Sequence, residues 1–195
     1  MSAKKYSDSQ KNQGLESHAG KYLTFELAQE EYGIGILKIK EIIGMMPITP
    51  VPHTPPHVKG IINLRGMIIP VTDLRLKFGL EVRDYTDRTC IIVVEVNNHS
   101  GKVTMGLVVD GVSEVSNIKG EDIADTPDFG ARVNSDYIQA MAKMEGRVKL
   151  LLDIDRVLHE EELACLNEPQ ARRRGLRTAN FPLEEDASEL GANTL

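Results

Sequence analysis

Residues 58–74 read VKGIINLRGMIIPVTDL, in which two β-branched runs flank the four residues Asn63-Leu64-Arg65-Gly66. Asparagine suits the first position of a type I turn, and glycine suits the last position, where a positive φ is needed. The stretch therefore predicts a tight β-hairpin with Leu64 and Arg65 at its tip. Because Pro70 has no N–H to donate, we expect the second strand to be an edge strand or to carry a bulge at that point.

Arg65 lies where the predicted hairpin would hold a cation beyond a rigid support. Charged residues are mostly exposed, so one interpretation is a solvated turn residue without a further role. The other interpretation is a binding contact, because a guanidinium offers a planar fork of donors to a carboxylate. The local sequence leaves both open.

The composition excludes several classes of protein. The chain has 195 residues, of which 41% are hydrophobic, enough for one ordinary domain or two small ones. A formal net charge of −6 argues against a nucleic-acid or anionic-membrane surface. No run approaches the roughly 20 apolar residues of a membrane helix, and residues 1–20 lack the apolar core of a signal peptide. Two cysteines, Cys90 and Cys165, do not make a disulfide framework, so a reduced, cytoplasmic protein is expected.

The pattern along the chain predicts short strands joined by turns. Residues 1–20 are polar and are expected to be disordered, and residues 167–195 are expected to form a mobile tail. The first turn is expected at Glu30-Glu31, and a long loop over residues 121–134. Predicted strands besides the hairpin cover residues 22–27, 32–36, 39–43, 89–96, 102–110, 112–118, 137–144 and 146–152. Residues 39–43 fit either one helical turn or a strand, and their β-branched content favours the strand. Capping aspartates predict two short helices, one from Leu74 to Phe78 after Asp73 and one from Asp153 to about Leu166.

Residues 47–57, PITPVPHTPPH, are rich in proline. They could form a polyproline ligand, a metal site at His53 and His57, or a stiff loop between two strands. A metal site needs three or four converging ligands, and neither a cysteine nor a further histidine lies nearby in the sequence. The loop is favoured, and the sequence predicts no metal site and no cofactor.

The two halves of the sequence resemble each other. The pattern of residues 33–42 recurs over residues 106–115, at an offset of 106 − 33 = 73. The segment from Gly66 to Asp73 corresponds to that from Gly146 to Asp153, at an offset of 146 − 66 = 80. Roughly five strands per unit close best into a small barrel, because closure removes exposed edges. The duplication therefore predicts a mainly β protein made of two small barrels packed together.

Motifs of catalysis are absent from the sequence. We find no G-x-S-x-G elbow, no phosphate-binding loop and no G-x-G-x-x-G. Cys90 lies in an apolar run without a histidine partner, which is typical of an inert core thiol. A binding module is therefore favoured over an enzyme.

Several motifs occur in a fixed order: EYGI at 31–34, KIKEI at 38–42, VKGIINLRG at 58–66, PVTDLR at 70–75 and GLVVDGV at 106–112. Together they resemble the CheW family of chemotaxis coupling proteins. The resemblance extends from about Lys21 to Leu166, which defines one predicted domain over residues 21–166. The Asn-Leu-Arg-Gly hairpin is its most specific part.

The resemblance implies a fold and a function. The family fold is two SH3-like five-stranded β-barrels around a shared core, intertwined in one domain, with short helices that include a C-terminal one. Its members are non-catalytic adaptors that link methyl-accepting chemotaxis receptors to a CheA-type histidine kinase, in the cytoplasm at membrane-associated receptor arrays. A groove between the barrels receives the receptor's helical hairpin, and the barrel ends meet the kinase. No nucleic acid and no direct membrane insertion are expected.

The resemblance also implies a set of contact residues for the receptor or the kinase. They are Ile39, Glu41, Gly60, Asn63, Arg65, Cys90 and Gly106. With the family in view, a receptor contact becomes the favoured interpretation of Arg65. The alternative function is an enzyme with a site in the inter-barrel groove, which convergent ionisable residues with strongly shifted pKa values would favour. An apolar groove rimmed by Glu41 and Arg65 would favour the adaptor.

Overall fold

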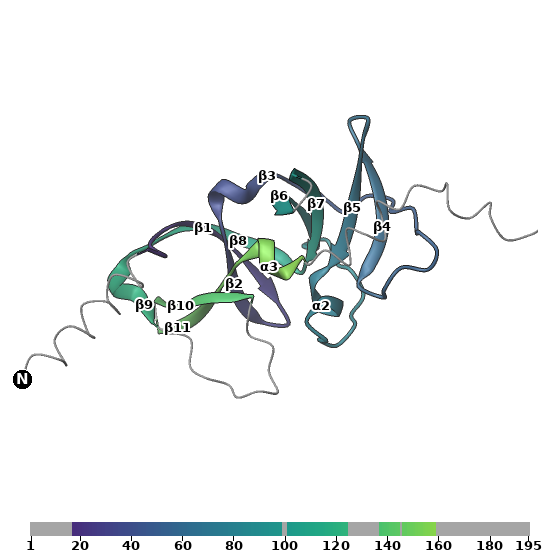
Figure 1. Ribbon diagram of the computed structural model, residues 1–195. Coiled ribbons are helices and arrows are strands. Elements are labelled where there is room, and N and C mark those ends of the chain that lie inside the picture. The colour runs from purple at the N-terminus through teal and green to yellow at the C-terminus, as the bar shows by residue number, and fades with distance from the viewer. Residues whose placement is uncertain (1–16, 99–100, 125–136, 145, 159–195) are drawn as a thin grey trace, which may run out of the picture.

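The computed structural model describes residues 17–98, 101–124, 137–144 and 146–158, which fold into two adjacent β-sheets (Figure 1). The strands are β1 (Gly20–Leu27), β2 (Glu30–Gly35), β3 (Ile39–Gly44), β4 (Val58–Leu64), β5 (Met67–Asp73), β6 (Cys90–Asn98), β7 (Gly101–Val109), β8 (Gly111–Ile118), β9 (Ile123–Ala124), β10 (Ile138–Met144) and β11 (Arg147–Leu152). The helices are short: α2 (Leu74–Lys77), α3 (Ile154–Val157) and the 3-10 turns η1 (Ile36–Lys38) and η2 (Gly120–Asp122).

Each sheet forms a small SH3-like barrel. The first has the strand order β8-β1-β2-β11-β10-β9, and the second has the order β3-β6-β7-β5-β4. Neighbours are antiparallel except for β2 with β11 and β5 with β7, which are parallel. The mainly β class with two barrels is confirmed, with the two-residue β9 as an addition to the five expected strands of the first barrel.

The two barrels show the duplication strand by strand. In the parallel ladders Gly33 pairs with Leu151, and Gly106 pairs with Val71. These positions correspond at the offsets found in the sequence, since 33 + 73 = 106 and 71 + 80 = 151. The two strand orders therefore superimpose, with β8, β1, β2, β11 and β10 in one barrel taking the places of β3, β6, β7, β5 and β4 in the other.

Each barrel contains strands from both halves of the chain. β3 follows β1 and β2 in sequence, but it pairs with β6 in the second barrel. β8 follows β6 and β7, but it pairs with β1 in the first barrel. The chain therefore crosses between the barrels at η1 and again at Asp110, and the halves are intertwined.

The core follows the same arrangement. One large cluster contains fully buried residues of both barrels, such as Phe25 of β1, Leu74 of α2 and Ile92 of β6. A smaller cluster around Ile62 fills the second barrel, and another around Leu151 fills the first. Apolar burial stabilises by about 25 cal/mol per Å², so the shared cluster makes each barrel depend on the other.

Two turns differ from their predicted positions. The β4–β5 hairpin is present, but Leu64 still pairs with Met67, so the tip consists of Arg65 and Gly66 with φ of 52° and 88°. Two consecutive positive φ values make this a type I′ turn, whose twist suits a two-residue hairpin better than type I does. The first turn lies at Ala28 and Gln29, with φ of 53° and 74°, and not at Glu30-Glu31, which belongs to β2.

Pro70 is not in an edge strand, because β5 lies between β7 and β4. The residue pairs with Ile61 on the β4 side, whereas the parallel ladder with β7 begins one residue later, at Val71. A missing N–H is tolerated at Pro70 because this residue does not pair with β7.

The predicted helix caps are confirmed. The Asp73 carboxylate accepts hydrogen bonds from the backbone of Arg75 at 2.9 Å and Leu76 at 3.4 Å, and Asp153 accepts from Asp155 N at 3.1 Å. Helix α3 is described only to Val157, so its predicted extension to Leu166 lies outside the described residues. The same holds for residues 1–16 of the N-terminal segment and for the tail 167–195.

The proline-rich segment is a loop held against β4. Thr49 and Ile61 exchange two backbone hydrogen bonds of 2.9 Å each. They approach so closely that a β-carbon on Gly60, whose φ is 138°, would lie 2.1 Å from the Thr49 carbonyl oxygen. Gly60 therefore fixes the loop to the second barrel.

Gly60→Ala is expected to destabilise the protein by about 3 kcal/mol, because both the positive φ and the Thr49 backbone oppose a side chain. Urea unfolding followed by circular dichroism measures the loss. Gly44→Ala is the matched control: a β-carbon there meets no atom within 4 Å, so its stability should change by less than about 1 kcal/mol. Equal stabilities of the two variants would contradict the close approach.

Candidate protein-binding surfaces

The structure gathers all seven sequence-predicted contact residues in the second barrel, the five-stranded one. They are Ile39 and Glu41 on β3, Gly60 and Asn63 on β4, Arg65 at the hairpin tip, Cys90 on β6 and Gly106 on β7. They differ in exposure, and only some of them can touch a partner.

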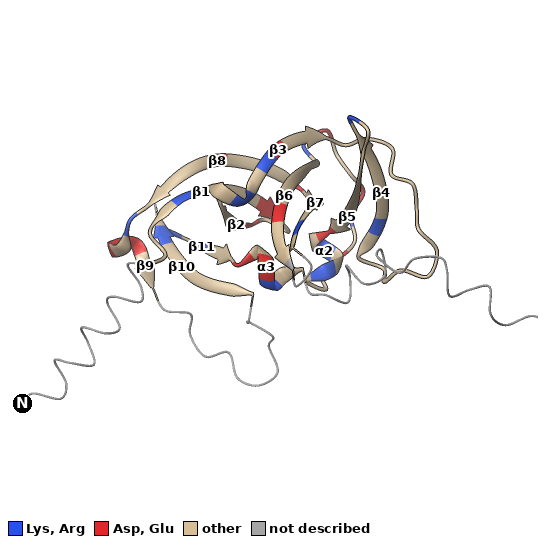
Figure 2. Ribbon diagram, turned by 45° about the horizontal axis from the view of Figure 1, so that its top comes forward, with Lys and Arg blue, Asp and Glu red and all other residues tan. Residues whose placement is uncertain are grey.

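Arg65 forms a bidentate ion pair with Glu41. Its two terminal nitrogens donate to the two carboxylate oxygens at 3.2 and 2.8 Å. The Asn63 side chain holds the turn by accepting from Gly66 N at 2.8 Å. Because β3 and β4 are the two ends of the sheet order, the pair bridges the two ends of the second barrel. Arg65 is therefore more than a solvated turn residue, although its side chain is 74% exposed at the basic tip (Figure 2).

Exposed apolar residues follow both members of this pair in sequence. Ile42 comes after Glu41 and is 45% exposed, and Met67 and Ile68 come after the tip and are 55% and 62% exposed. A charged fork with large apolar neighbours is typical of a protein-binding surface. We call Glu41, Ile42, Arg65, Met67 and Ile68 the hairpin-tip surface.

The other predicted residues lie elsewhere in the second barrel, and most of them have packing roles. Ile39 packs against the large shared core cluster. Cys90 is half-buried, and burial raises the pKa of its thiol, as expected for an unreactive cysteine. A β-carbon on Gly106 would lie 2.8 Å from Ile91 Cγ2, so this glycine allows close packing of neighbouring strands. Gly60 likewise allows close packing, in this case between β4 and the proline-rich loop at Thr49.

A groove with a volume of about 490 Å³ lies against the first barrel and the crossover that leads to the second. Residues 19–22, 35–38, 139 and 152–154 line it. Leu37, on η1, is 96% exposed at this groove. Leu37 is not among the residues predicted from the sequence, because a leucine that follows Ile34 and Ile36 resembles a core residue, and only its place on a 3-10 turn points it outward. Neither Glu41 nor Arg65 is among the lining residues, so the groove and the hairpin-tip surface are separate.

Lys38, next to Leu37, is held by Asp155 of α3 at 2.6 Å. The Asp155 carboxylate also accepts from the backbone N and the side chain of Asn97, at 2.9 and 3.2 Å. Partial burial raises the pKa of Asp155, but the hydrogen bonds from Lys38 and Asn97 outweigh it, and the pKa is lowered. This ion pair therefore fixes the crossover beside the groove.

A second, polar cavity of about 510 Å³ opens on the first barrel. Its charged centre is Lys149, whose side chain is 8% exposed and lies 3.3 Å from Glu31 and 3.7 Å from Glu114. At the offset of 80 its counterpart in the second barrel is Ile69, and at the offset of 73 the counterpart of Glu31 is Thr104. The fold therefore accepts uncharged residues at both positions.

The largest pKa shifts in the described ranges do not converge on one pocket. Lys102 and Lys40 lower the pKa of Glu95 to about 2 on the second barrel, whereas burial and Asp73 raise the pKa of Tyr85 to about 12 in the loop after α2. Within those ranges no three histidine, cysteine, aspartate or glutamate side chains are grouped as metal ligands would be. Nor does any helix there have the length and hydrophobicity to cross a membrane.

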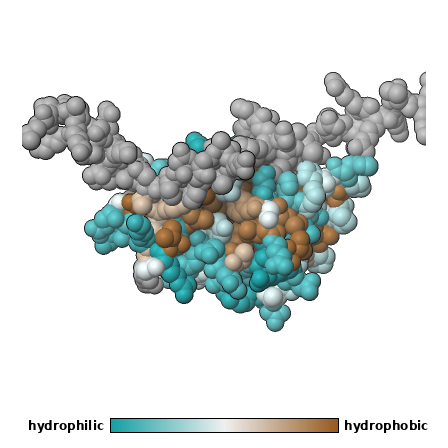
Figure 3. Space-filling model, turned by 90° about the horizontal axis from the view of Figure 1, so that it is seen from below, coloured by the Kyte–Doolittle hydropathy of each residue, from teal (hydrophilic) through white to brown (hydrophobic). Residues whose placement is uncertain are grey.

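Apolar surface is not confined to the groove and the hairpin tip. The face seen from below carries hydrophobic patches among hydrophilic residues (Figure 3). Exposed apolar surface on several faces suits a protein that associates with others.

Comparison with known proteins decides the family, because residues 21–162 match the CheW-like domain. The chain belongs to the CheW family. Chemotaxis protein CheW of Klebsiella aerogenes is 38% identical over 146 residues, which are 75% of this chain and 86% of that protein. Chemotaxis protein CheW of Rhizobium meliloti is 33% identical over 154 residues, covering 75% and 97%. The crystal structure of scaffolding protein TtCheW from Thermoanaerobacter tengcongensis has a TM-score of 0.64 and 33% identity, covering 74% of this chain and 95% of that one.

Family membership confirms the resemblance seen in the sequence. The CheW family consists of non-catalytic adaptors of chemotaxis, so this chain is an adaptor and not an enzyme.

Lys149→Ile is expected to destabilise the protein by about 1–3 kcal/mol, because the largely buried Glu31 loses its cation. Adding Glu31→Thr, which completes the residue pair of the second barrel, should recover this loss or exceed it. Urea unfolding of the two variants and the parent measures both steps. A double variant less stable than the single one would mean that the two barrels are not equivalent here.

Asp155→Asn is expected to destabilise the protein near neutral pH and to have a smaller effect in acid. A carboxyl group with a lowered pKa in the folded state stabilises the fold above its unfolded value of about 3.9, and this contribution is lost as the pH falls through the folded value. Thermal unfolding at pH 7, 4 and 3 follows the difference from the parent. Asp87→Asn, on the exposed loop after α2, is the control. A difference in melting temperature between Asp155→Asn and the parent that does not change with pH would contradict the ion pair.

Proposed function

We propose that this CheW-family chain couples the cytoplasmic tips of methyl-accepting chemotaxis receptors to a CheA-type histidine kinase, in the cytoplasm at membrane-associated receptor arrays. The observation that carries the proposal is Leu37, an almost fully exposed leucine on a 3-10 turn beside a groove of about 490 Å³. Exposing a leucine to water has a free-energy cost of about 1.5–3 kcal/mol relative to burial, which a docked partner would recover.

The groove suits a receptor helix. An amphipathic helix docks by placing apolar side chains spaced three or four residues apart into such a groove. Leu37 supplies an apolar contact at the edge, while Lys21 and Lys38 supply cations beside it. The Lys38–Asp155 ion pair keeps this edge in place before binding, so little ordering is needed when the receptor docks.

The hairpin-tip surface suits the second partner, the kinase. It lies outside the groove lining, and so one chain can hold both partners at once. Arg65 is oriented by Glu41 before binding, and Met67 and Ile68 offer apolar area next to it. In this proposal Arg65 contacts the kinase, whereas the family resemblance alone had favoured a receptor contact. Ile39, Asn63, Cys90, Gly60 and Gly106 act by holding the surface in shape.

Leu37→Glu is expected to weaken binding of a receptor cytoplasmic fragment by about thirty-fold or more, while kinase binding stays within about two-fold. Arg65→Glu is expected to do the reverse, because it places two carboxylates side by side in an interface. Both side chains are exposed in the free protein, so the free energy of unfolding should change by less than about 1 kcal/mol. Isothermal titration against each purified partner measures the four affinities.

Two control variants match these changes in chemistry. Val82→Glu places a carboxylate on another exposed apolar residue, and Arg83→Glu reverses another exposed arginine; both are on the loop after α2. Neither should change either affinity. Receptor binding that survives Leu37→Glu would remove the groove from the proposal, and receptor loss in Arg65→Glu would return Arg65 to the receptor site.

A further inference from the structure

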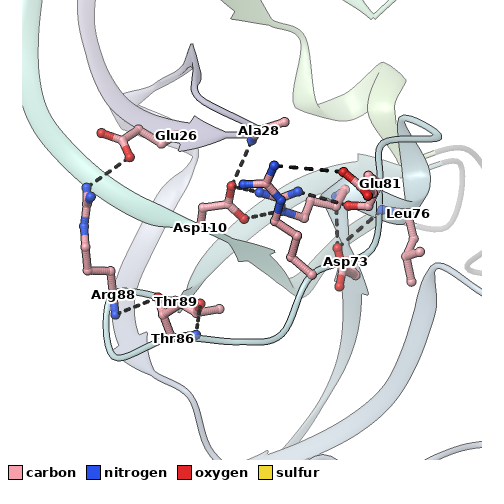
Figure 4. Close-up of polar contacts among 11 residues, drawn as sticks. Glu26, Ala28, Asp73, Leu76, Glu81, Thr86, Arg88, Thr89 and Asp110 are labelled. Atoms are coloured by element: carbon pink, nitrogen blue, oxygen red, sulfur yellow. Dashed lines mark hydrogen bonds and ion pairs between the residues drawn. The ribbon is translucent and has the colours of Figure 1, made fainter.

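The crossover at Asp110 is clamped to helix α2. The guanidinium of Arg75 donates two hydrogen bonds to the Asp110 carboxylate and a third to the Glu81 carbonyl at 3.0 Å (Figure 4). The same carboxylate accepts from Ala28 N, at the end of β1, at 2.8 Å. Arg75 is largely buried, with a side chain only 10% exposed. This clamp joins a helix cation, a crossover anion and a backbone amide.

The other crossover is clamped to helix α3 by the same three parts. Asp155 on the helix holds Lys38 at the crossover and accepts from Asn97 N, at the end of β6. The charges are exchanged: here the helix carries the anion, and the crossover carries the cation.

The positions in the two clamps correspond. The helix residues are related by the offset of 80, since 75 + 80 = 155. The backbone amides correspond through the strand registers. Leu23 pairs with Ile34 in the first barrel, and Ile92 pairs with Leu107 in the second. Since 34 + 73 = 107, residue 23 corresponds to residue 92, and at the same offset of 69 residue 28 corresponds to residue 97. Asp110 aligns with residue 110 − 73 = 37, one residue before Lys38. The two clamps are therefore duplicates with inverted polarity.

Each clamp joins one half of the chain to the other. In the first clamp the helix residue Arg75 belongs to the first half, residues 20–79, and the crossover residue Asp110 belongs to the second half, residues 90–158. In the second clamp the helix residue Asp155 belongs to the second half, and the crossover residue Lys38 belongs to the first. If two first halves paired with each other, Arg75 would face Lys38, cation against cation. If two second halves paired, Asp155 would face Asp110, anion against anion. Attraction in both clamps occurs only when a first half pairs with a second half.

Apolar packing alone discriminates poorly between these arrangements, because corresponding core positions hold similar residues. Val71 and Leu151 are one such pair, and Leu74 and Ile154 are another, all buried. Partners of similar shape are separated most effectively by charges that repel in the wrong combination. We propose that the two inverted clamps are a pairing code, by which each half of the duplicated chain accepts the other half and rejects a copy of itself.

The decisive variant exchanges the helix charges: Arg75→Asp with Asp155→Arg. It keeps the formal net charge, makes both native clamps repulsive and makes both self-pairings attractive. Analytical ultracentrifugation of the full chain, run beside the parent, should show the parent's species reduced about tenfold or more in favour of larger species. Adding the matching crossover changes, Lys38→Asp and Asp110→Lys, restores opposite charges in each clamp, although Ala28 N and Asn97 N lose their acceptors. This fourfold variant should recover the parent's mass and a cooperative thermal transition, at a melting temperature below the parent's.

The control exchanges an exposed pair of opposite charges, Lys119→Glu with Glu121→Lys, and should behave as the parent does. If the helix-exchange variant unfolds without associating, the clamps stabilise the fold but do not select between partners, and the proposal is overturned. A helix-exchange variant with the parent's mass and melting temperature overturns the proposal. A fourfold variant that recovers neither mass nor folding overturns it too, because the charges would then not act in pairs.

Discussion

The structure depends on two crossings of the chain between the barrels, at η1 and at Asp110. After the first crossing β3 pairs with β6, and after the second β8 pairs with β1. Without these crossings each sheet would lack an end strand and expose an unpaired edge, which proteins avoid. The large shared cluster joins the two barrels, with Phe25, Leu74 and Ile92 fully buried. The two barrels therefore form one cooperative unit.

The same constraint produces the groove. A chain that crosses from β2 to β3 cannot stay in either sheet, and it turns through η1 instead. A 3-10 turn of three residues cannot bury all its side chains, so Leu37 faces outward while Ile36 packs against the core. Lys38 then reaches back to Asp155. The proposed receptor site is in this sense a consequence of how the barrels are joined.

The fold could be predicted further than the site, for physical reasons. The offsets of 73 and 80 and the two aspartate caps are local patterns, and such patterns report strands, turns and helix starts directly. The hairpin tip was misplaced by one residue because Asn63 and Gly66 fit the ends of a type I turn, whereas the twist of the paired strands selects type I′. Glu41 and Arg65 are 24 residues apart, so only the closure of the barrel brings them together. Leu37 was missed because hydrophobicity predicts burial unless the backbone turns the residue away from the core.

The duplicated glutamate shows how two similar barrels acquire different surfaces. Glu41 and Glu114 correspond at the offset of 73, and each lies near a cation from the hairpin opposite it. In the second barrel this cation is Arg65, at the tip and 74% exposed; in the first it is Lys149, within β11 and 8% exposed. An exposed guanidinium can exchange its carboxylate for one on a partner at little cost in free energy. A buried ammonium held by two carboxylates would lose more interaction free energy than a new carboxylate could return. The same backbone thus presents an exposed cation in one barrel and a closed charge cluster in the other, so the two barrels offer different surfaces.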